Sequence, residues 1–236
     1  MERPKKSIQA VILAAGRGTR MKHLTEVLPK PMLSVAGKNL LQHKIDILPK
    51  EITEVILVVG YLGETIRSFF GDEYGGRKIT YVWMDTLNGT GKALWRVKDL
   101  IRGTFLVMMG DDLYSANDVE KMLAHKWAVL VDKVPLLMRG GRVVLDGGGH
   151  LVDIIEGQGH DVVDGLVNTG MYVLQPEIFN YELVKLEGRE EWGLPQTLIS
   201  AARNVSVAVV ESTFWLQMTD PDDVVYAEKV FGKASV

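Results

Sequence analysis

Along about the first 110 residues, short continuous apolar runs alternate with stretches whose apolar residues recur at helical spacing. After Asn39, for example, Leu41, Ile45 and Leu48 fall on one side of a helix. Such alternation predicts a mainly parallel sheet covered by helices on both faces. The predicted strands are Ile8–Ala14, Val55–Val59, Ile79–Met84 and Phe105–Met109, and the predicted helices are one that begins near Asn39, Glu64–Phe70 and Gly91–Leu100.

Beyond this first half, the apolar stretches become shorter and glycine turns separate them. Arg142–Leu145 and His150–Ile155 flank a run of glycines and form a predicted hairpin. The last helix has a defined start, with Asp220 as N-cap and Pro221 in the first turn. The other predicted elements are the strands Val167–Leu174 and Val205–Val210 and the helix Leu194–Ala202.

Composition narrows the class of protein. Of the 236 residues, 47% are hydrophobic and 24% charged, which suits one soluble α/β domain or two joined halves. A net charge of −3 argues against broad nucleic-acid binding, and the lack of cysteine excludes disulfides and thiolate metal sites. No apolar run reaches the roughly 18 residues of a membrane span. Met1–Ser7 is basic, but no apolar segment of signal-peptide type follows it, so we expect a cytoplasmic protein.

The loop after the first strand carries the residues of a polyphosphate site. Gly16 and Gly18 free the backbone to turn and to approach a ligand closely. A glycine-rich turn at the carboxyl end of a strand can aim several N–H groups at a phosphate. Arg20 adds a planar, permanently charged fork, and Lys30 is held between two prolines of fixed φ.

Two better-known phosphate loops do not fit this stretch. The P-loop needs Gly-Lys-Ser/Thr after four spacers, and nothing of that form follows Gly16. The dinucleotide fingerprint needs a third glycine or alanine where Met21 stands. The stretch instead resembles the signature of the sugar-phosphate nucleotidyltransferases, or nucleoside-diphosphate-sugar pyrophosphorylases, which is roughly (L)(A/G)(A/G)GxGTRLxPLTxxxPKPLLPV. The matching residues are Leu13-Ala14-Ala15-Gly16-Arg17-Gly18-Thr19-Arg20-Met21, Leu24-Thr25 and Pro29-Lys30-Pro31-Met32-Leu33.

This resemblance implies a Rossmann-like α/β/α sandwich with a mainly parallel, mixed central sheet. It implies an Mg²⁺-dependent enzyme that condenses a nucleoside triphosphate with a sugar 1-phosphate, or a similar phosphorylated acceptor, and releases pyrophosphate. The whole chain, 1–236, would be one such domain, with a nucleotide-binding half at about 1–110 and an acceptor-binding half at about 111–236. No nucleic acid or membrane partner is expected, and the oligomeric state is left open.

The resemblance also assigns residues to roles. Gly110-Asp111-Asp112 is similar to the family's Gly-Asp element, in which the aspartate holds Mg²⁺, and Asp111 is preferred over Asp112. Glu156 and the stretch from Asn168 to Tyr172 resemble the family's sugar-binding pair. The predicted catalytic residues are Arg20, Lys30 and Asp111, the nucleotide-binding residues are Leu13, Ala14, Ala15, Gly16, Gly18, Thr19, Asn88, Gly89 and Thr90, the acceptor-binding residues are Glu156, Asn168 and Gly170, and the metal ligands are Asp111 and Gln217.

The chain departs from the family pattern at the acceptor phosphate. The family often has Lys-Pro after the sugar-binding glutamate, whereas Gly157 follows Glu156 here. Arg139, Arg142 or Lys30 could supply the missing charge.

Two further departures concern the metal and the base. Gln217 stands where the family often has a second metal-binding aspartate, and its amide oxygen is a neutral and weaker donor. Asp220 is more economically a helix cap than a substitute ligand. Leu87 stands where members that read a pyrimidine often have glutamine, so Asn88 becomes the candidate to read a base edge, and the base itself stays open.

Two other classes of function remain as alternatives. A glycosyltransferase of similar fold would use Gly110-Asp111-Asp112 as its metal motif but would leave Arg20 and Lys30 without a task. A non-catalytic regulatory protein that binds sugar nucleotides would explain Gln217 and the missing lysine after Glu156.

Overall fold

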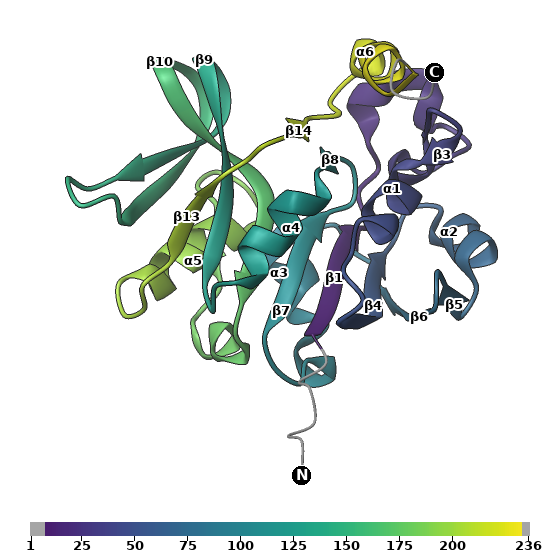
Figure 1. Cartoon of the computed structure of the whole chain (residues 1–236), viewed down its shortest axis with the longest axis horizontal. Helices are drawn as coiled ribbons and strands as arrows, with labels where there is room; N and C mark the ends of the chain where they lie inside the picture. The colour runs from purple at the N-terminus through teal and green to yellow at the C-terminus, as the bar shows by residue number, and fades with distance from the viewer. Residues whose placement is uncertain (1–7, 233–236) are drawn as a thin grey trace.

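A computed structural model describes residues 8–232, and within that range the side chains of all residues except 138, 139, 158–160 and 232. The basic stretch Met1–Ser7 lies outside the described residues. The centre of the fold is an eight-stranded sheet with the order β13-β9-β10-β7-β1-β4-β6-β5 (Figure 1). None of the described helices is long and apolar enough to cross a membrane.

Four parallel strands form the middle of this sheet. β1 (Ile8–Ala14) lies between β4 (Ile52–Val59) and β7 (Phe105–Met109), and β6 (Arg77–Trp83) follows β4. Along the chain, β4 and β6 are therefore added on one side of β1, and β7 is then added on its other side. Such a reversal leaves a crevice at the carboxyl ends of the two strands, where open α/β sheets bind ligands. Antiparallel strands flank this core, which confirms the predicted mixed α/β fold.

Helices cover both faces of the sheet because alternate residues of each buried strand point to opposite sides. Ile12 packs into one apolar core with α1 (Leu40–Asp46), α2 (Gly63–Phe70) and α4 (Ala116–Leu123). Val11 packs into a second core with α3 (Thr90–Trp95) and α5 (Leu194–Ala202) on the other face. The result is the three-layered arrangement that the alternation of the sequence predicts.

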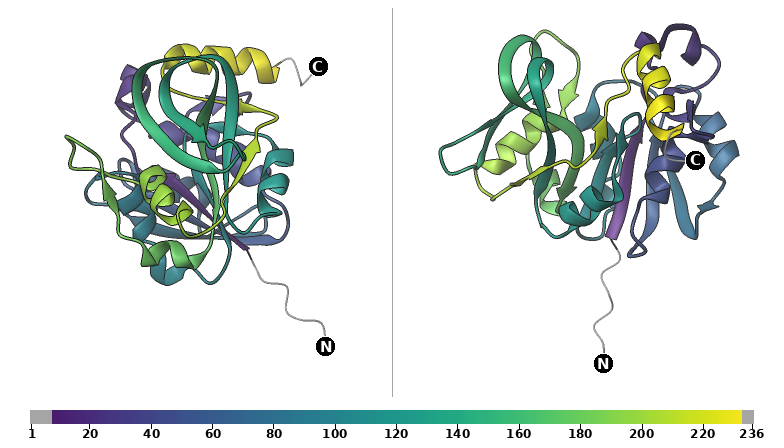
Figure 2. Two further views of the ribbon diagram at one scale, coloured as in Figure 1. Left: turned by 90° about the vertical axis from the view of Figure 1, so that its left-hand side faces the viewer. Right: turned by 45° about the horizontal axis from the view of Figure 1, so that its top comes forward.

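A long two-stranded ribbon joins the sheet at one end and extends beyond it. β9 (Ala128–Leu145) and β10 (Leu151–Leu174) are paired antiparallel over their length, with register shifts near Val162 and Val167. Figures 1 and 2 show the ribbon rising past the sheet and its tip turning back toward α5. The predicted hairpin Arg142–Leu145 with His150–Ile155 is this tip.

The remaining elements are short, apart from the last helix. They are β2 (Ser34–Val35), β3 (Lys38–Asn39), β5 (Glu73–Tyr74), β8 (Leu113–Tyr114), β11 (Val184–Lys185), β12 (Trp192–Gly193), β13 (Ala208–Glu211), β14 (Trp215–Leu216), α6 (Pro221–Gly232) and the 3₁₀ turns Thr19–Thr25, Lys30–Met32, Lys98–Leu100 and Pro176–Asn180.

Most predicted elements are present, and several have different bounds. β1, β7 and α5 have the predicted bounds, and Asn39 caps α1 through a hydrogen bond from the Gln42 amide. α3 is shorter than predicted, because the backbone leaves the helical region at Val97 and a 3₁₀ turn follows. β13 begins at Ala208 and not at Val205. α4 and the first part of β9 were not predicted.

A buried carboxylate ties the chain that leaves β13 to α4. The side chain of Asp118 is fully buried and accepts hydrogen bonds from the amide and hydroxyl of Thr213 and from the amide of Phe214. Ser115, the N-cap of α4, also contacts the Thr213 hydroxyl. Residues 213–214 are therefore fixed by α4 although they follow it by about 95 positions. We call residues 212–219 the crossing segment.

We expect Asp118→Ala to lower the free energy of unfolding by about 2–3 kcal/mol, because two backbone amides and a hydroxyl lose their fully buried charged acceptor at once. Urea denaturation followed by circular dichroism measures this change. Glu120→Ala, at an exposed position of the same helix, is the matched control and should change stability by less than about 0.5 kcal/mol. Equal effects of the two substitutions would show that Asp118 does not anchor the crossing segment.

Candidate functional site

The carboxyl ends of β1 and β7 bring two loops together. The Gly110 amide, directly after β7, donates a hydrogen bond to the Leu13 carbonyl at 2.9 Å. Asp111 therefore lies next to the glycine-rich loop that follows β1. Both loops line a cavity of about 350 Å³, which we call the first cavity. It lies at the crevice where strand order reverses, the position that the fold favours for a ligand.

Gly18 and Lys30 determine the shape of the glycine-rich loop. Gly18 has a φ of +64°, in the left-handed region that favours glycine. A Cβ at this position would lie 2.8 Å from the Cβ of Lys30, so the glycine also lets the lysine stem pack against the loop. The Lys30 side chain is only 8% exposed, and both its backbone neighbours are prolines. Its stem is therefore fixed, and the residue lines the first cavity.

The opposite wall of the first cavity is the loop before α3. The Trp192 amide donates to the Asn88 carbonyl at 2.9 Å, and Gly89, at a φ of +95°, packs directly against the Trp192 backbone. This loop is thus fixed to β12. The Asn88 Oδ1 atom is buried and has no hydrogen-bond partner in the part of the chain that the structure describes.

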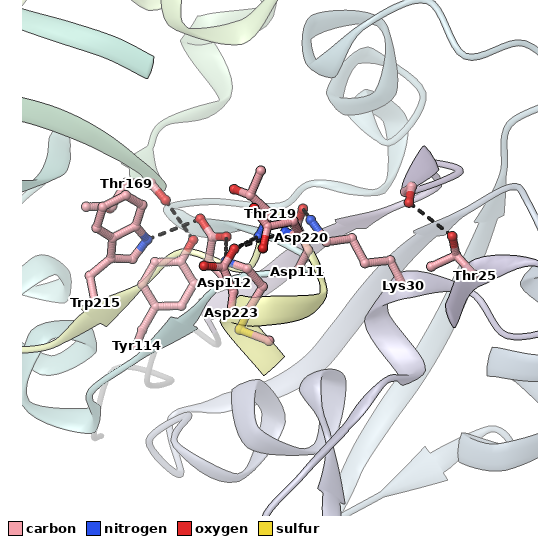
Figure 3. Close-up of polar contacts among 12 residues, drawn as sticks. Thr25, Lys30, Asp111, Asp112, Tyr114, Thr169, Trp215, Thr219, Asp220 and Asp223 are labelled. Carbon is pink, nitrogen blue, oxygen red and sulfur yellow. Dashed lines mark hydrogen bonds and ion pairs between the residues drawn. The ribbon is translucent and has the colours of Figure 1, made fainter. Parts of the chain in front are cut away.

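The two aspartates after β7 have different environments (Figure 3). Asp111 Oδ2 lies 2.6 Å from Lys30 Nζ, and the Asp111 side chain is 36% exposed and lines the first cavity. Asp112 is buried and accepts hydrogen bonds from Trp215 Nε1 at 3.1 Å and from the Met218 amide at 3.2 Å. Asp111 therefore faces the site, whereas Asp112 fixes the crossing segment.

Beneath these aspartates lies a lysine that contacts no solvent. Lys44 of α1 is fully buried, and its Nζ donates to the Leu40 carbonyl at 3.3 Å. Burial lowers the pKa of Lys44 to about 8, and the charges of Asp111 and Asp112 oppose that shift. Burial, with the neighbouring charge of Asp111, raises the pKa of Asp112 to about 7. Lys30, Lys44, Asp111 and Asp112 therefore form one electrostatic cluster.

A second cavity, also of about 350 Å³, adjoins the first on the side of the ribbon. Glu156, Asn168, Gly170 and Gln217 line it together with Lys30 and Asp111. The Asn168 amide is oriented by the protein, because Nδ2 donates to the Tyr172 hydroxyl at 2.7 Å and Oδ1 accepts from the Gly170 amide at 3.1 Å. Among the described residues, one N–H and one lone pair of this amide have no hydrogen-bond partner and could bind a ligand.

Every residue that the sequence assigns to the site lines one of these two cavities. The predicted catalytic residues line both cavities and therefore lie where the cavities meet. They are Arg20, Lys30 and Asp111. Arg142 was a candidate for the acceptor phosphate but is not among the residues that line them, and the Arg139 side chain lies outside those described. Asp220 accepts from the Asp222 amide and caps α6, as predicted.

Sequence reasoning missed two cations of the site. Arg189, in the loop between β11 and β12, lines the second cavity and a third one of about 580 Å³ beside it. Its local sequence holds no signal, because the loop reaches the cavity only through the pairing of β11 with β12. The burial of Lys44 could have been predicted. The helical spacing that buries Leu41, Ile45 and Leu48 places Lys44 on the same side of the helix.

The structure is that of an α/β protein with a glycine-rich loop at the carboxyl end of β1, beside two adjoining cavities. The chain belongs to the nucleotidyl transferase family, whose sequence model matches residues 9–229. It is 34% identical to the UTP–glucose-1-phosphate uridylyltransferase AglF of Haloferax volcanii, over 94% of this chain and 96% of that protein.

Two other relatives extend this comparison. The chain is 32% identical to the bifunctional protein GlmU of Methanocaldococcus jannaschii over 94% of this chain but 54% of that protein, so it spans about half the length of this relative. The structure of a UDP-glucose pyrophosphorylase complexed with UDP-glucose superimposes with a TM-score of 0.83 at 19% identity, covering 96% of this chain and 99% of the other, which supports the fold.

The buried position of Asp112 predicts a pH dependence of stability. Its pKa is raised from 3.8 to about 7 in the folded state, so the native protein holds this proton more tightly than the unfolded chain does. The resulting stabilisation is present below about pH 4 and is lost as the pH rises to about 7. Relative to Asp112→Asn, the wild type should lose about 2 kcal/mol of unfolding free energy between pH 5 and pH 7.

Urea denaturation at several pH values tests this prediction, with Asp99→Asn as an exposed control that should follow the wild type. A constant difference between wild type and Asp112→Asn across this range would show that Asp112 has an ordinary pKa.

Proposed function

We propose that this protein is a sugar-phosphate nucleotidyltransferase, which joins a nucleoside triphosphate to a sugar 1-phosphate or similar phosphorylated acceptor and releases pyrophosphate. The observation that carries the proposal is the junction of the two cavities. A loop rich in backbone amides lies on one side, a pocket lined by hydrogen-bonding side chains lies on the other, and Arg20, Lys30 and Asp111 lie between them.

The nucleotide is assigned to the first cavity. The amides of residues 14–19 and the Arg20 guanidinium bind the phosphates that leave as pyrophosphate. Gly89 and the neighbouring backbone hold the nucleoside. The buried Asn88 Oδ1 is an acceptor that an N–H group of the base would satisfy.

The acceptor is assigned to the second cavity. Glu156 and the oriented amide of Asn168 bind hydroxyl groups. The attacking phosphate is already an anion, so no general base is required, and the protein acts by positioning and charge stabilisation. Lys30 brings the incoming phosphate and the α-phosphate together by offsetting their repulsion. Arg189 supplies the acceptor-side cation that the sequence lacks after Glu156.

The donors present fit Mg²⁺. Asp111 and Gln217 line the same cavity and offer a carboxylate and an amide oxygen, the hard donors that this ion prefers. Among the described residues no group of three or more His, Cys, Asp and Glu side chains could hold a metal ion, which suits an ion that takes its other ligands from phosphates and water. When bound, Mg²⁺ would neutralise phosphate charge and orient the α-phosphate.

A pyrophosphate-release assay with four nucleoside triphosphates and a panel of sugar 1-phosphates and other phosphomonoesters tests the proposed reaction. We expect one pair to give Mg²⁺-dependent turnover that Asp111→Asn lowers at least 100-fold, because an electrostatic group at the reacting phosphates is removed. Asp112→Asn should keep most of the activity. Sugar transfer from a nucleotide sugar without pyrophosphate release would indicate a glycosyltransferase, and nucleotide-sugar binding without turnover would indicate a regulatory protein.

We expect Arg189→Gln to raise the KM for the acceptor at least tenfold and to leave the KM for the nucleotide within twofold, because a charge-assisted contact to phosphate is lost on one side only. Steady-state kinetics with each substrate varied in turn measures the two constants. Arg203→Gln, at an exposed arginine after α5, is the control. A larger effect on the nucleotide KM than on the acceptor KM would show that Arg189 contacts the nucleotide and not the acceptor.

A further inference from the structure

Lys30 and Asp111 form an ion pair with each other, although the proposed function gives each of them a different charged partner. Their charged atoms are 2.6 Å apart, and this is the one polar contact of Lys30 Nζ within residues 8–232 (Figure 3). In the proposed reaction, Lys30 contacts phosphates and Asp111 binds a divalent cation. The ammonium group occupies Oδ2 of Asp111, and a divalent cation bound to the same carboxylate would lie within a few ångströms of it. The two positive charges would repel each other strongly, so each weakens the binding of the other.

The surroundings anchor the Asp111 backbone and the Lys30 stem, and they leave the end of the Lys30 side chain able to rotate. Asp111 follows Gly110, whose amide is hydrogen-bonded to the neighbouring strand β1. The Lys30 stem packs against Gly18, and Lys30 lines both cavities. Rotation about the terminal bonds of the side chain would turn its ammonium group from Asp111 toward a ligand in either cavity. Lys44, the other cation of the cluster, is fully buried and stays beneath the site.

We propose that Lys30 and the divalent cation compete for Asp111, so that Asp111 holds Lys30 until the cation arrives and displaces it. The displaced ammonium group is then free to bind the acceptor phosphate. This inference rests on the proposed function only in taking Asp111 as the metal ligand.

The first test measures binding of Mn²⁺, used alone as a probe for the metal, by calorimetry or electron paramagnetic resonance. Lys30→Met keeps the apolar stem and removes the competing charge, so it should bind Mn²⁺ at least tenfold more tightly than the wild type. Arg20→Met removes a cation that lines the same cavities but has no ion pair with Asp111 among the described residues, and it should change the affinity less than threefold. Equal tightening in both variants would show a general effect of charge and would overturn direct competition.

The second test uses the wild-type protein. Lysine acylation by an amine-reactive reagent, followed by peptide mass spectrometry, measures whether Lys30 is paired. Mn²⁺ should raise the reactivity of Lys30 severalfold and leave that of the exposed Lys22 unchanged. In Asp111→Asn, Lys30 should be reactive without the metal and insensitive to it. A Lys30 reactivity that Mn²⁺ does not change in the wild type would overturn the proposal.

These measurements do not depend on turnover, so they separate two kinds of failure. If Asp111→Asn binds Mn²⁺ as tightly as the wild type does, Asp111 is not a metal ligand, and the assignment made under the proposed function is wrong. Asp111→Asn could instead lose Mn²⁺ binding while Lys30→Met binds Mn²⁺ no more tightly than the wild type does. In that case Asp111 is a metal ligand, and the proposed competition with Lys30 is wrong.

Discussion

The hydrogen bond between the Gly110 amide and the Leu13 carbonyl is the contact on which the arrangement of the site depends. It closes the pairing of β1 with β7 at their carboxyl ends, where the strand order reverses. The glycine-rich loop and Asp111 lie about 100 positions apart in the sequence, and this pairing makes them neighbours. Both strands are buried on both faces, so their register is fixed by the two apolar cores. The position of Asp111 is thus a consequence of core packing.

The adjacent aspartates show how one short loop serves two purposes. Asp111 lines both cavities, whereas Asp112 is buried, lines only the second cavity and accepts hydrogen bonds from the crossing segment. Asp112, with Asp118, binds the crossing segment through its backbone and Trp215. That segment carries Gln217 to the wall of the second cavity. Buried carboxylates thereby position a site residue that follows them by about 100 positions.

The sequence predicted the parts of this protein that depend on local patterns. The strand β1 and the start of a helix near Asn39 are each specified by neighbouring residues, and each was found as predicted. The length of the ribbon was not predicted, because Gly140 and Gly141 indicate an interruption, whereas the pairing of β9 with β10 continues through them. Arg189 reaches the site through a strand pairing that its own sequence does not indicate.

Under the proposed function, the charge balance of the cluster accounts for a neutral residue at position 217. Lys30 and Lys44 carry two positive charges when protonated, and Asp111 and Asp112 carry two negative charges when ionised. The cluster is then electrically balanced without any ligand, and a third carboxylate at position 217 would give it a negative charge. A balanced cluster attracts a free divalent cation weakly, whereas phosphates contribute both negative charge and ligands. With glutamine at this position, the site is better suited to a cation that arrives with its nucleotide than to one that is permanently bound.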